Sequence, residues 1–82
     1  MKIKFNWEEK PDCFKCELGE FEMFVRVYDE SYYEFFIYIC DMLVRNERRF
    51  LRESVAVAAC ELEVRQIIES ILLTVKQFEN EH

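Results

Sequence analysis

The sequence predicts an α+β domain in which a three- to four-stranded antiparallel sheet is packed by one long C-terminal helix. Up to about residue 52, apolar and polar side chains alternate, as they do in half-buried strands. From residue 54 onward, apolar residues recur every three or four positions, which is the period of a helix. A chain of 82 residues with one Gly and one Pro has no evident linker, so we expect a single domain over residues 1–82, with the sheet over about 1–52 and the helix over about 54–78.

The first two predicted strands form a hairpin. Residues 13–18 and 21–28 alternate in character, and Leu18-Gly19-Glu20 between them is typical of a tight turn. Neighbouring side chains of a strand point to opposite faces, so one row of the second strand should face the core. That row is Phe21, Met23, Val25 and Val27.

A third strand is predicted over residues 32–40, after the polar turn 29–31, because this stretch is dense in aromatic and β-branched residues. A fourth, short strand is expected over about 48–51, after a turn at 44–47. The apolar row of the third strand should face the core beside Met23, and it consists of Tyr33, Phe35, Ile37 and Ile39.

The helix is expected to begin after Ser54, whose hydroxyl can accept a hydrogen bond from a free backbone N–H of the first turn. It should end near Phe78. An alternative start near Glu47 stays open because five apolar residues follow one another at sevenfold spacing. They are Phe50, Val57, Val64, Ile71 and Phe78.

This helix is too long for the sheet to cover. It would span about 36 Å, whereas an eight-residue strand spans about 27 Å. The excess falls in residues 67–75, which are apolar around most of the helix and therefore favour burial on more than one side. We expect a homodimer interface there, formed by Ile67, Ile68, Ile71, Leu72 and Val75.

The charge balance bears on the class of partner. The chain carries 17 acidic and 11 basic residues, for a formal net charge of −6. Such a field favours basic partners and opposes non-specific binding to nucleic acid. Aromatic residues make up 16% of the chain, which leaves apolar surface available for binding.

The outer face of the sheet is the predicted partner-binding site, because aromatics mixed with a few charges are typical of recognition surfaces. Its residues are Phe24, Arg26, Tyr28, Glu34, Phe36 and Tyr38. A protein partner is expected, with the alternatives that the N-terminal segment around Trp7 covers this face or that nucleic acid binds it. A second candidate is an arginine cluster that either contacts an anion or partner or pairs with carboxylates of its own chain. It consists of Arg45, Arg48, Arg49 and Arg52.

Catalytic chemistry is not expected, and neither is a metal or cofactor. The one histidine, His82, is the last residue, so a nucleophile would lack a positioned base. Cys13 and Cys16 have the spacing of half a zinc site, but in a strand they project to opposite faces. A metal site built from them and a further pair is a third, weaker hypothesis. We therefore expect a non-enzymatic binding protein.

No apolar run of signal-peptide or membrane-spanning length occurs in the sequence. Four cysteines without a sign of an oxidising compartment are expected to stay as free thiols. A cytoplasmic protein is the resulting expectation.

The predicted order of three or four strands followed by a helix opening Ser54-Val55-Ala56-Val57-Ala58-Ala59-Cys60-Glu61 resembles that of small phage and prophage proteins, including anti-CRISPR and other anti-defence inhibitors. The resemblance implies an inhibitor in the host cytoplasm whose carboxylates occupy the phosphate positions of a basic, nucleic-acid-binding complex. The pattern is also similar to that of double-stranded-RNA-binding domains, although the basic residues expected at the helix tip are absent.

Overall fold

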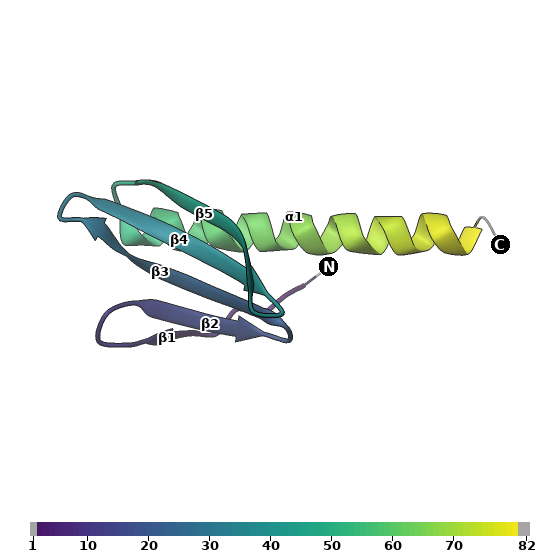
Figure 1. Cartoon of the computed structure of the whole chain (residues 1–82), viewed down its shortest axis with the longest axis horizontal. Coiled ribbons are helices and arrows are strands. Elements are labelled where there is room, and N and C mark those ends of the chain that lie inside the picture. Colours follow the sequence, from purple (N-terminus) through teal and green to yellow (C-terminus); the bar gives the residue numbers. More distant parts are fainter. Residues whose placement is uncertain (1, 81–82) are drawn as a thin grey trace.

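In the computed structural model, which describes residues 2–80, the chain forms an antiparallel sheet followed by one helix (Figure 1). The elements are β1 (Trp7–Glu9), β2 (Phe14–Leu18), β3 (Phe21–Asp29), β4 (Tyr32–Ile39), β5 (Met42–Phe50) and α1 (Glu53–Asn80). The strands lie side by side in chain order, so each pairs with the next. The α+β class is confirmed, but the sheet has five strands rather than three or four.

The additional strand is β1, at the edge of the sheet. Its Trp7 stands opposite Cys16 of β2. The indole Nε1 of Trp7 donates a hydrogen bond of 2.8 Å to the Glu61 carboxylate, which ties this short strand to the helix. Three residues are too few to show an alternating pattern, so the sequence alone does not reveal the strand.

The turn expected at residues 44–47 is wrong, because these residues lie inside β5. The chain reverses instead at Cys40 and Asp41, whose φ angles are 50° and 66°. Two successive positive φ values fit a two-residue hairpin turn of the primed type, which usually carries Asn-Gly. Cys-Asp gives no such signal, and β5 is therefore longer than predicted.

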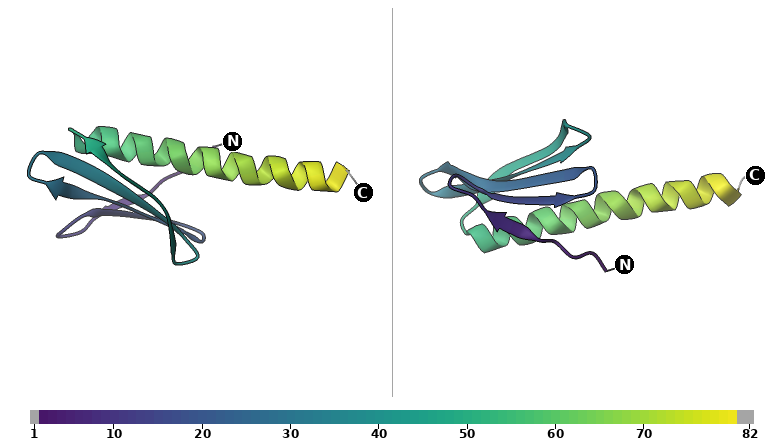
Figure 2. Two further views of the ribbon diagram at one scale, coloured as in Figure 1. Left: turned by 45° about the horizontal axis from the view of Figure 1, so that its top comes forward. Right: turned by 90° about the horizontal axis from the view of Figure 1, so that it is seen from below.

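The core lies between the sheet and the first half of α1, which crosses one face of the sheet (Figure 2). The predicted inward rows of β3 and β4 are confirmed at Met23, Val25, Phe35 and Ile37, which are buried. Val27 is wrong, since it is 52% exposed next to an irregularity in the β3–β4 register. The buried apolar residues are Cys16, Met23, Val25, Phe35, Ile37, Phe50, Ala56, Cys60 and Val64.

Helix α1 begins one residue before the predicted N-cap. The carbonyl of Arg52 accepts a hydrogen bond of 3.1 Å from the Ala56 N–H, so Arg52 takes the capping position and Ser54 lies in the first turn. The acidic side chain of Glu53 in that turn suits the positive end of the helix dipole. The alternative start near Glu47 is wrong because Glu47 belongs to β5.

The second half of α1 extends beyond the sheet, as the sequence predicts (Figure 1). The molecule measures 52 × 24 × 21 Å, and the helix sets the long dimension. Every residue from 69 to 80 is exposed, whereas Ala56, Cys60 and Val64 in the first half are buried.

Candidate functional site

Three aromatic side chains stand together on the face of the sheet that points away from α1. We call this surface the outer sheet face. Phe24 of β3 lies directly opposite Phe36 of β4, and Tyr38 is two residues further along β4. The Phe24 and Tyr38 rings meet edge to face with centroids 5.8 Å apart, and the Phe36 and Tyr38 rings are 6.4 Å apart and nearly parallel. The alternation of each strand therefore produces a continuous aromatic platform.

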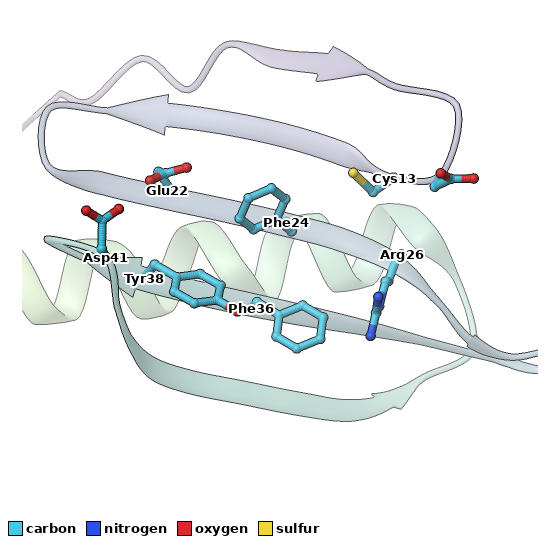
Figure 3. A pocket seen from close by; sticks show the side chains of 8 residues that line it. Cys13, Glu22, Phe24, Arg26, Phe36, Tyr38 and Asp41 are labelled. Carbon is cyan, nitrogen blue, oxygen red and sulfur yellow. The ribbon is translucent and has the colours of Figure 1, made fainter.

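The platform forms the floor of a groove of about 460 Å³ that opens to solvent (Figure 3). Arg26 stands at one end of the platform in Figure 3, and Glu22 and Asp41 stand at the other. The residues that line the groove are Asp12, Cys13, Glu22, Phe24, Arg26, Phe36, Tyr38 and Asp41.

Glu34, predicted as an exposed contact residue, is buried. It projects to the outer face as the alternation requires, but only 1% of its surface is accessible because neighbouring side chains cover it. Its carboxylate accepts hydrogen bonds from Arg26 at 2.9 Å, Asn46 at 3.1 Å and Arg48 at 3.2 Å. Glu34 therefore positions Arg26, Asn46 and Arg48, and its own carboxylate is closed to solvent.

The electrostatics of this network favour the charged carboxylate. Burial alone would raise the pKa of Glu34, but hydrogen bonds from Asn46 and Arg26, together with the charges of Arg26 and Arg48, outweigh it and hold the pKa below its ordinary value. One carboxylate here balances two guanidinium groups, so the Glu34 network carries a local positive charge.

Both guanidinium groups of the network also lie against aromatic rings. Arg26 lies 4.8 Å from the centroid of Phe36, and Arg48 lies 4.6 Å from that of Tyr28. Such cation–π contacts hold the arginines at the surface while about half of each side chain stays exposed. Tyr28 lies beside the groove and does not line it.

The opposite end of the groove is acidic. Next to Glu22 and Asp41 there is a second hollow of about 170 Å³, to which Glu17 and Glu20 also contribute. Among the described residues, Lys15 is the only cation that pairs with any of these carboxylates, at 2.9 Å from Glu17 and 3.7 Å from Glu22. The groove therefore runs from an end that holds Arg26, with Asp12 and Cys13 beside it, to an end that holds several carboxylates, across an apolar floor.

The predicted arginine cluster is divided between different carboxylates. Arg45 pairs with Glu63 of α1 at 2.9 Å, Arg49 pairs with Glu47 at 3.5 Å, and Arg48 belongs to the Glu34 network. Arg52 lies at the start of the helix, where its side chain is exposed. These arginines therefore do not gather into one anion-binding surface, which favours the alternative that they pair with carboxylates of their own chain.

The cysteines do not assemble a reactive or metal-binding centre in the described part of the chain. Cys13 lines the outer groove, whereas Cys16 is buried in the core, so the two thiols diverge as predicted. Burial raises the pKa of the Cys16 thiol, and it raises that of Cys60 to about 12. Neither core thiol is therefore a nucleophile at neutral pH.

The predicted dimer-interface residues fall into two groups along α1. Ile67 and Ile68 are half-buried and pack against the edge of the core. Ile71, Leu72 and Val75 lie beyond the sheet and are 50%, 46% and 48% exposed. The structure thus leaves the distal part of the predicted interface open to solvent.

Reasoning from the sequence missed the groove residues that come from loops. Asp12 and Cys13 precede β2, and Asp41 lies in the turn whose position was predicted wrongly. Asn46, which donates to both Glu34 and the Phe35 carbonyl, was assigned to a turn. Strand alternation locates residues within a strand, but it does not locate a loop residue against them.

Two further observations concern the chain as a whole. Within residues 2–80, α1 does not combine the length and apolar character needed to cross a membrane. No protein-family model, curated protein or solved structure gives a significant match to the chain.

Proposed function

We propose that this chain is a non-enzymatic protein-binding module whose outer groove receives a segment of a partner protein. The observation that supports this most directly is the order of chemistry along the groove: the Arg26 end, the aromatic platform and the acidic end. An apolar side chain of the segment would cover the platform, and a Lys or Arg side chain would meet Glu22 and Asp41.

The shape of the groove favours a protein segment over a small molecule. Sites for small ligands are concave and bury most of the ligand surface. This groove opens to solvent along the sheet, and of its lining residues only Asp12, Cys13 and Asp41 lie outside the strands. Large aromatic side chains beside a few charges are typical of the centre of a protein interface.

The charge of the chain supports a basic partner. The formal net charge is −6, and the carboxylates of Glu20 and Asp41 form no ion pair within residues 2–80. Such a surface attracts a positively charged protein and can take the place of phosphate groups in its binding channel. An inhibitor of a nucleic-acid-binding complex, of the phage anti-defence type, is the specific role that we propose for it.

A nucleic acid is the second candidate ligand, and one observation favours it. Arg26 and Arg48 lie against aromatic rings, an arrangement that can also stack bases. The acidic end of the groove opposes this alternative because it would repel phosphates. Binding of short RNA or DNA at low ionic strength would support it, and the absence of binding there would eliminate it.

The test uses peptides because they probe the groove without a known partner. We would select binders from a random peptide library and map the best of them by NMR. Selected peptides should combine an apolar residue with Lys or Arg, and shifts should occur at Phe24, Phe36 and Tyr38. Phe36→Ser should weaken binding at least about tenfold, the loss typical of a central interface residue.

The control replaces an aromatic residue of the same strand outside the groove. Tyr32 is 43% exposed and does not line the groove, so Tyr32→Ser should leave peptide affinity unchanged. Asp41→Asn keeps a residue that tolerates positive φ and removes one charge, so it should weaken only peptides with a basic residue. Enrichment of acidic peptides, or equal losses for Phe36→Ser and Tyr32→Ser, would contradict the proposal.

A further inference from the structure

An apolar row runs along the whole of α1, and the sheet covers only its first half. Cys60 and Val64 are buried beneath the sheet. Counting onward in steps of three and four places Ile68, Ile71 and Val75 on the same side of the helix, and Phe78 continues the row. Phe78 is 63% exposed, and the exposure of the row increases where the sheet ends (Figure 1).

The exposed half of the helix lacks the packing that usually stabilises a helix. Residues 69–80 contribute no buried side chain, and they include the β-branched residues Ile71, Thr74 and Val75. An isolated helix of about 12 residues is marginal in water. Although the packed first half of α1 nucleates this segment, tertiary packing of an apolar face supplies most helix stability, and the segment lacks it. A partner that covers this row would supply that packing.

The charged residues beside the row are arranged with two-fold symmetry. Arg65 and Glu79 lie on the same flank of the row, and their midpoint is Leu72, which lies on that flank as well. Within residues 2–80, neither forms an ion pair, although Arg65 lies 5.2 Å from the centroid of the Phe5 ring. Rotation about an axis through Leu72 brings Arg65 of one helix opposite Glu79 of another.

The apolar residues fit the same register. When Arg65 is placed beside Glu79 of an antiparallel copy, Leu72 lies near Leu72 of that copy. The apolar layers are then centred one residue further along the helix, so that Ile71 packs beside Val75 and Ile68 packs beside Phe78. Antiparallel helices bring identical flanks together, so the charges pair with each other. The overlap spans about residues 65–80 of each helix, or about 24 Å. It uses the overhanging part of the helix and little else.

A parallel pair is excluded by the position of the sheet. The sheet lies on the same side of α1 as the apolar row, over Ala56, Cys60 and Val64 (Figure 2). Two parallel helices that joined these rows would require both sheets to occupy the same space. An antiparallel pair places the two sheets at opposite ends.

From these observations we infer that the exposed row of α1 binds a second copy of this chain as an antiparallel helix pair, with Arg65 of each copy beside Glu79 of the other. The occupant is a second copy because the charges of this flank complement themselves under a two-fold rotation. This inference does not depend on the outer groove, which lies on the opposite face of the sheet.

The first experiment measures mass by sedimentation equilibrium and light scattering over a range of concentrations. The full chain should dimerise, and Ile71→Glu should be monomeric. Leu73→Glu is the matched control, since Leu73 is 59% exposed but points away from the row, and it should remain dimeric. Circular dichroism should show that both variants keep the folded sheet and helix.

The second experiment tests the orientation by charge reversal. Glu79→Lys and Arg65→Glu each replace two attractive pairs by two repulsive ones, so each variant should dimerise about tenfold more weakly. Mixed in equal amounts, the two variants should form a heterodimer of nearly the parent affinity, because each lysine or arginine then faces a glutamate.

Three results would overturn the inference. A parent chain that stays monomeric at every accessible concentration removes the dimer altogether. A trimer or tetramer, or a dimer that persists in Ile71→Glu, excludes this interface. A dimer that Ile71→Glu abolishes but whose charge variants do not rescue each other excludes the antiparallel register. Peptide binding by the Ile71→Glu variant is measured as well. It shows whether the outer groove works, so that a failure of the dimer can be distinguished from a failure of the groove.

Discussion

At the scale of single residues, the outer sheet face depends on one buried carboxylate. Glu34 is enclosed by Arg26, Asn46 and Arg48, so the two guanidinium groups are fixed where they contact aromatic rings. The alternation of β4 predicts the direction of Glu34 correctly. It does not predict the burial, because long side chains from β3 and β5 fold over the carboxylate, and sequence gives no account of that packing.

Replacement of Glu34 by Gln should destabilise the protein by about 1–3 kcal/mol near neutral pH, because two arginines lose their carboxylate. The pKa of Glu34 is lowered in the folded state, so its contribution is present above the pKa of the unfolded chain and is lost as pH falls through the folded-state value. Urea unfolding from pH 7 to pH 3 should therefore show a smaller acid loss in Glu34→Gln than in the parent.

The control for this prediction is Glu30→Gln, in the exposed turn between β3 and β4. A surface substitution of this kind should change stability by no more than about 0.5 kcal/mol. If Glu34→Gln and Glu30→Gln unfold with the same pH dependence, the Glu34 network does not stabilise the fold.

At the scale of elements, the sequence predicts those whose pattern is long. The hairpin of β2 and β3, the strand β4 and the helix were all predicted, because each shows a clear period of two or of three to four. β1 is too short to show one, and β5 contains the polar stretch 45–49. Arg45 and Asn46 were therefore assigned to a turn, because the sequence does not show that their side chains pair with Glu63 and Glu34 across the strands.

The turn between β4 and β5 offers a test of backbone strain. Asp41 has a φ of 66°, a conformation that costs a residue with a side chain more than it costs glycine. We expect Asp41→Gly to raise the free energy of unfolding by about 0.5 kcal/mol, after the larger entropy of the unfolded glycine is deducted. Thermal and urea unfolding of the purified variant would measure this change.

The matched position lies in the turn between β2 and β3. Glu20 follows Gly19 and, unlike Asp41, is not among the described residues with positive φ. Glu20→Gly gains no relief of strain and should lower stability by about 0.5 kcal/mol. Changes of the same sign in the two glycine variants would show that the φ angle of Asp41 is not the cause.

At the scale of the whole molecule, the mismatch between helix and sheet dominates the architecture. The expected length of the helix alone predicts that it extends beyond the strands. The apolar segment 67–75 predicts which part of the helix does so. The aromatic row of the outer face was also predictable, at Phe24, Phe36 and Tyr38. The acidic end of the groove was not, because it forms only when two separate turns meet, joined by the hydrogen bond of 3.0 Å from the Cys40 N–H to the Glu20 carbonyl.

The same mismatch predicts that helix stability depends on protein concentration. If a second copy covers the exposed row, amide hydrogens of residues 69–80 should exchange about fivefold more slowly at a total protein concentration about ten times the dissociation constant than in the dilute monomer, because about one fifth of the chains then remain monomeric. Amide hydrogens of β3 and β4 are protected by the fold of each copy alone, so their exchange should slow far less. Hydrogen exchange measured at several dilutions, with Ile71→Glu as the monomeric control, provides the comparison. Exchange of residues 69–80 that is independent of concentration in the parent would mean that the distal helix is stable alone, and the physical need for a covering copy would disappear.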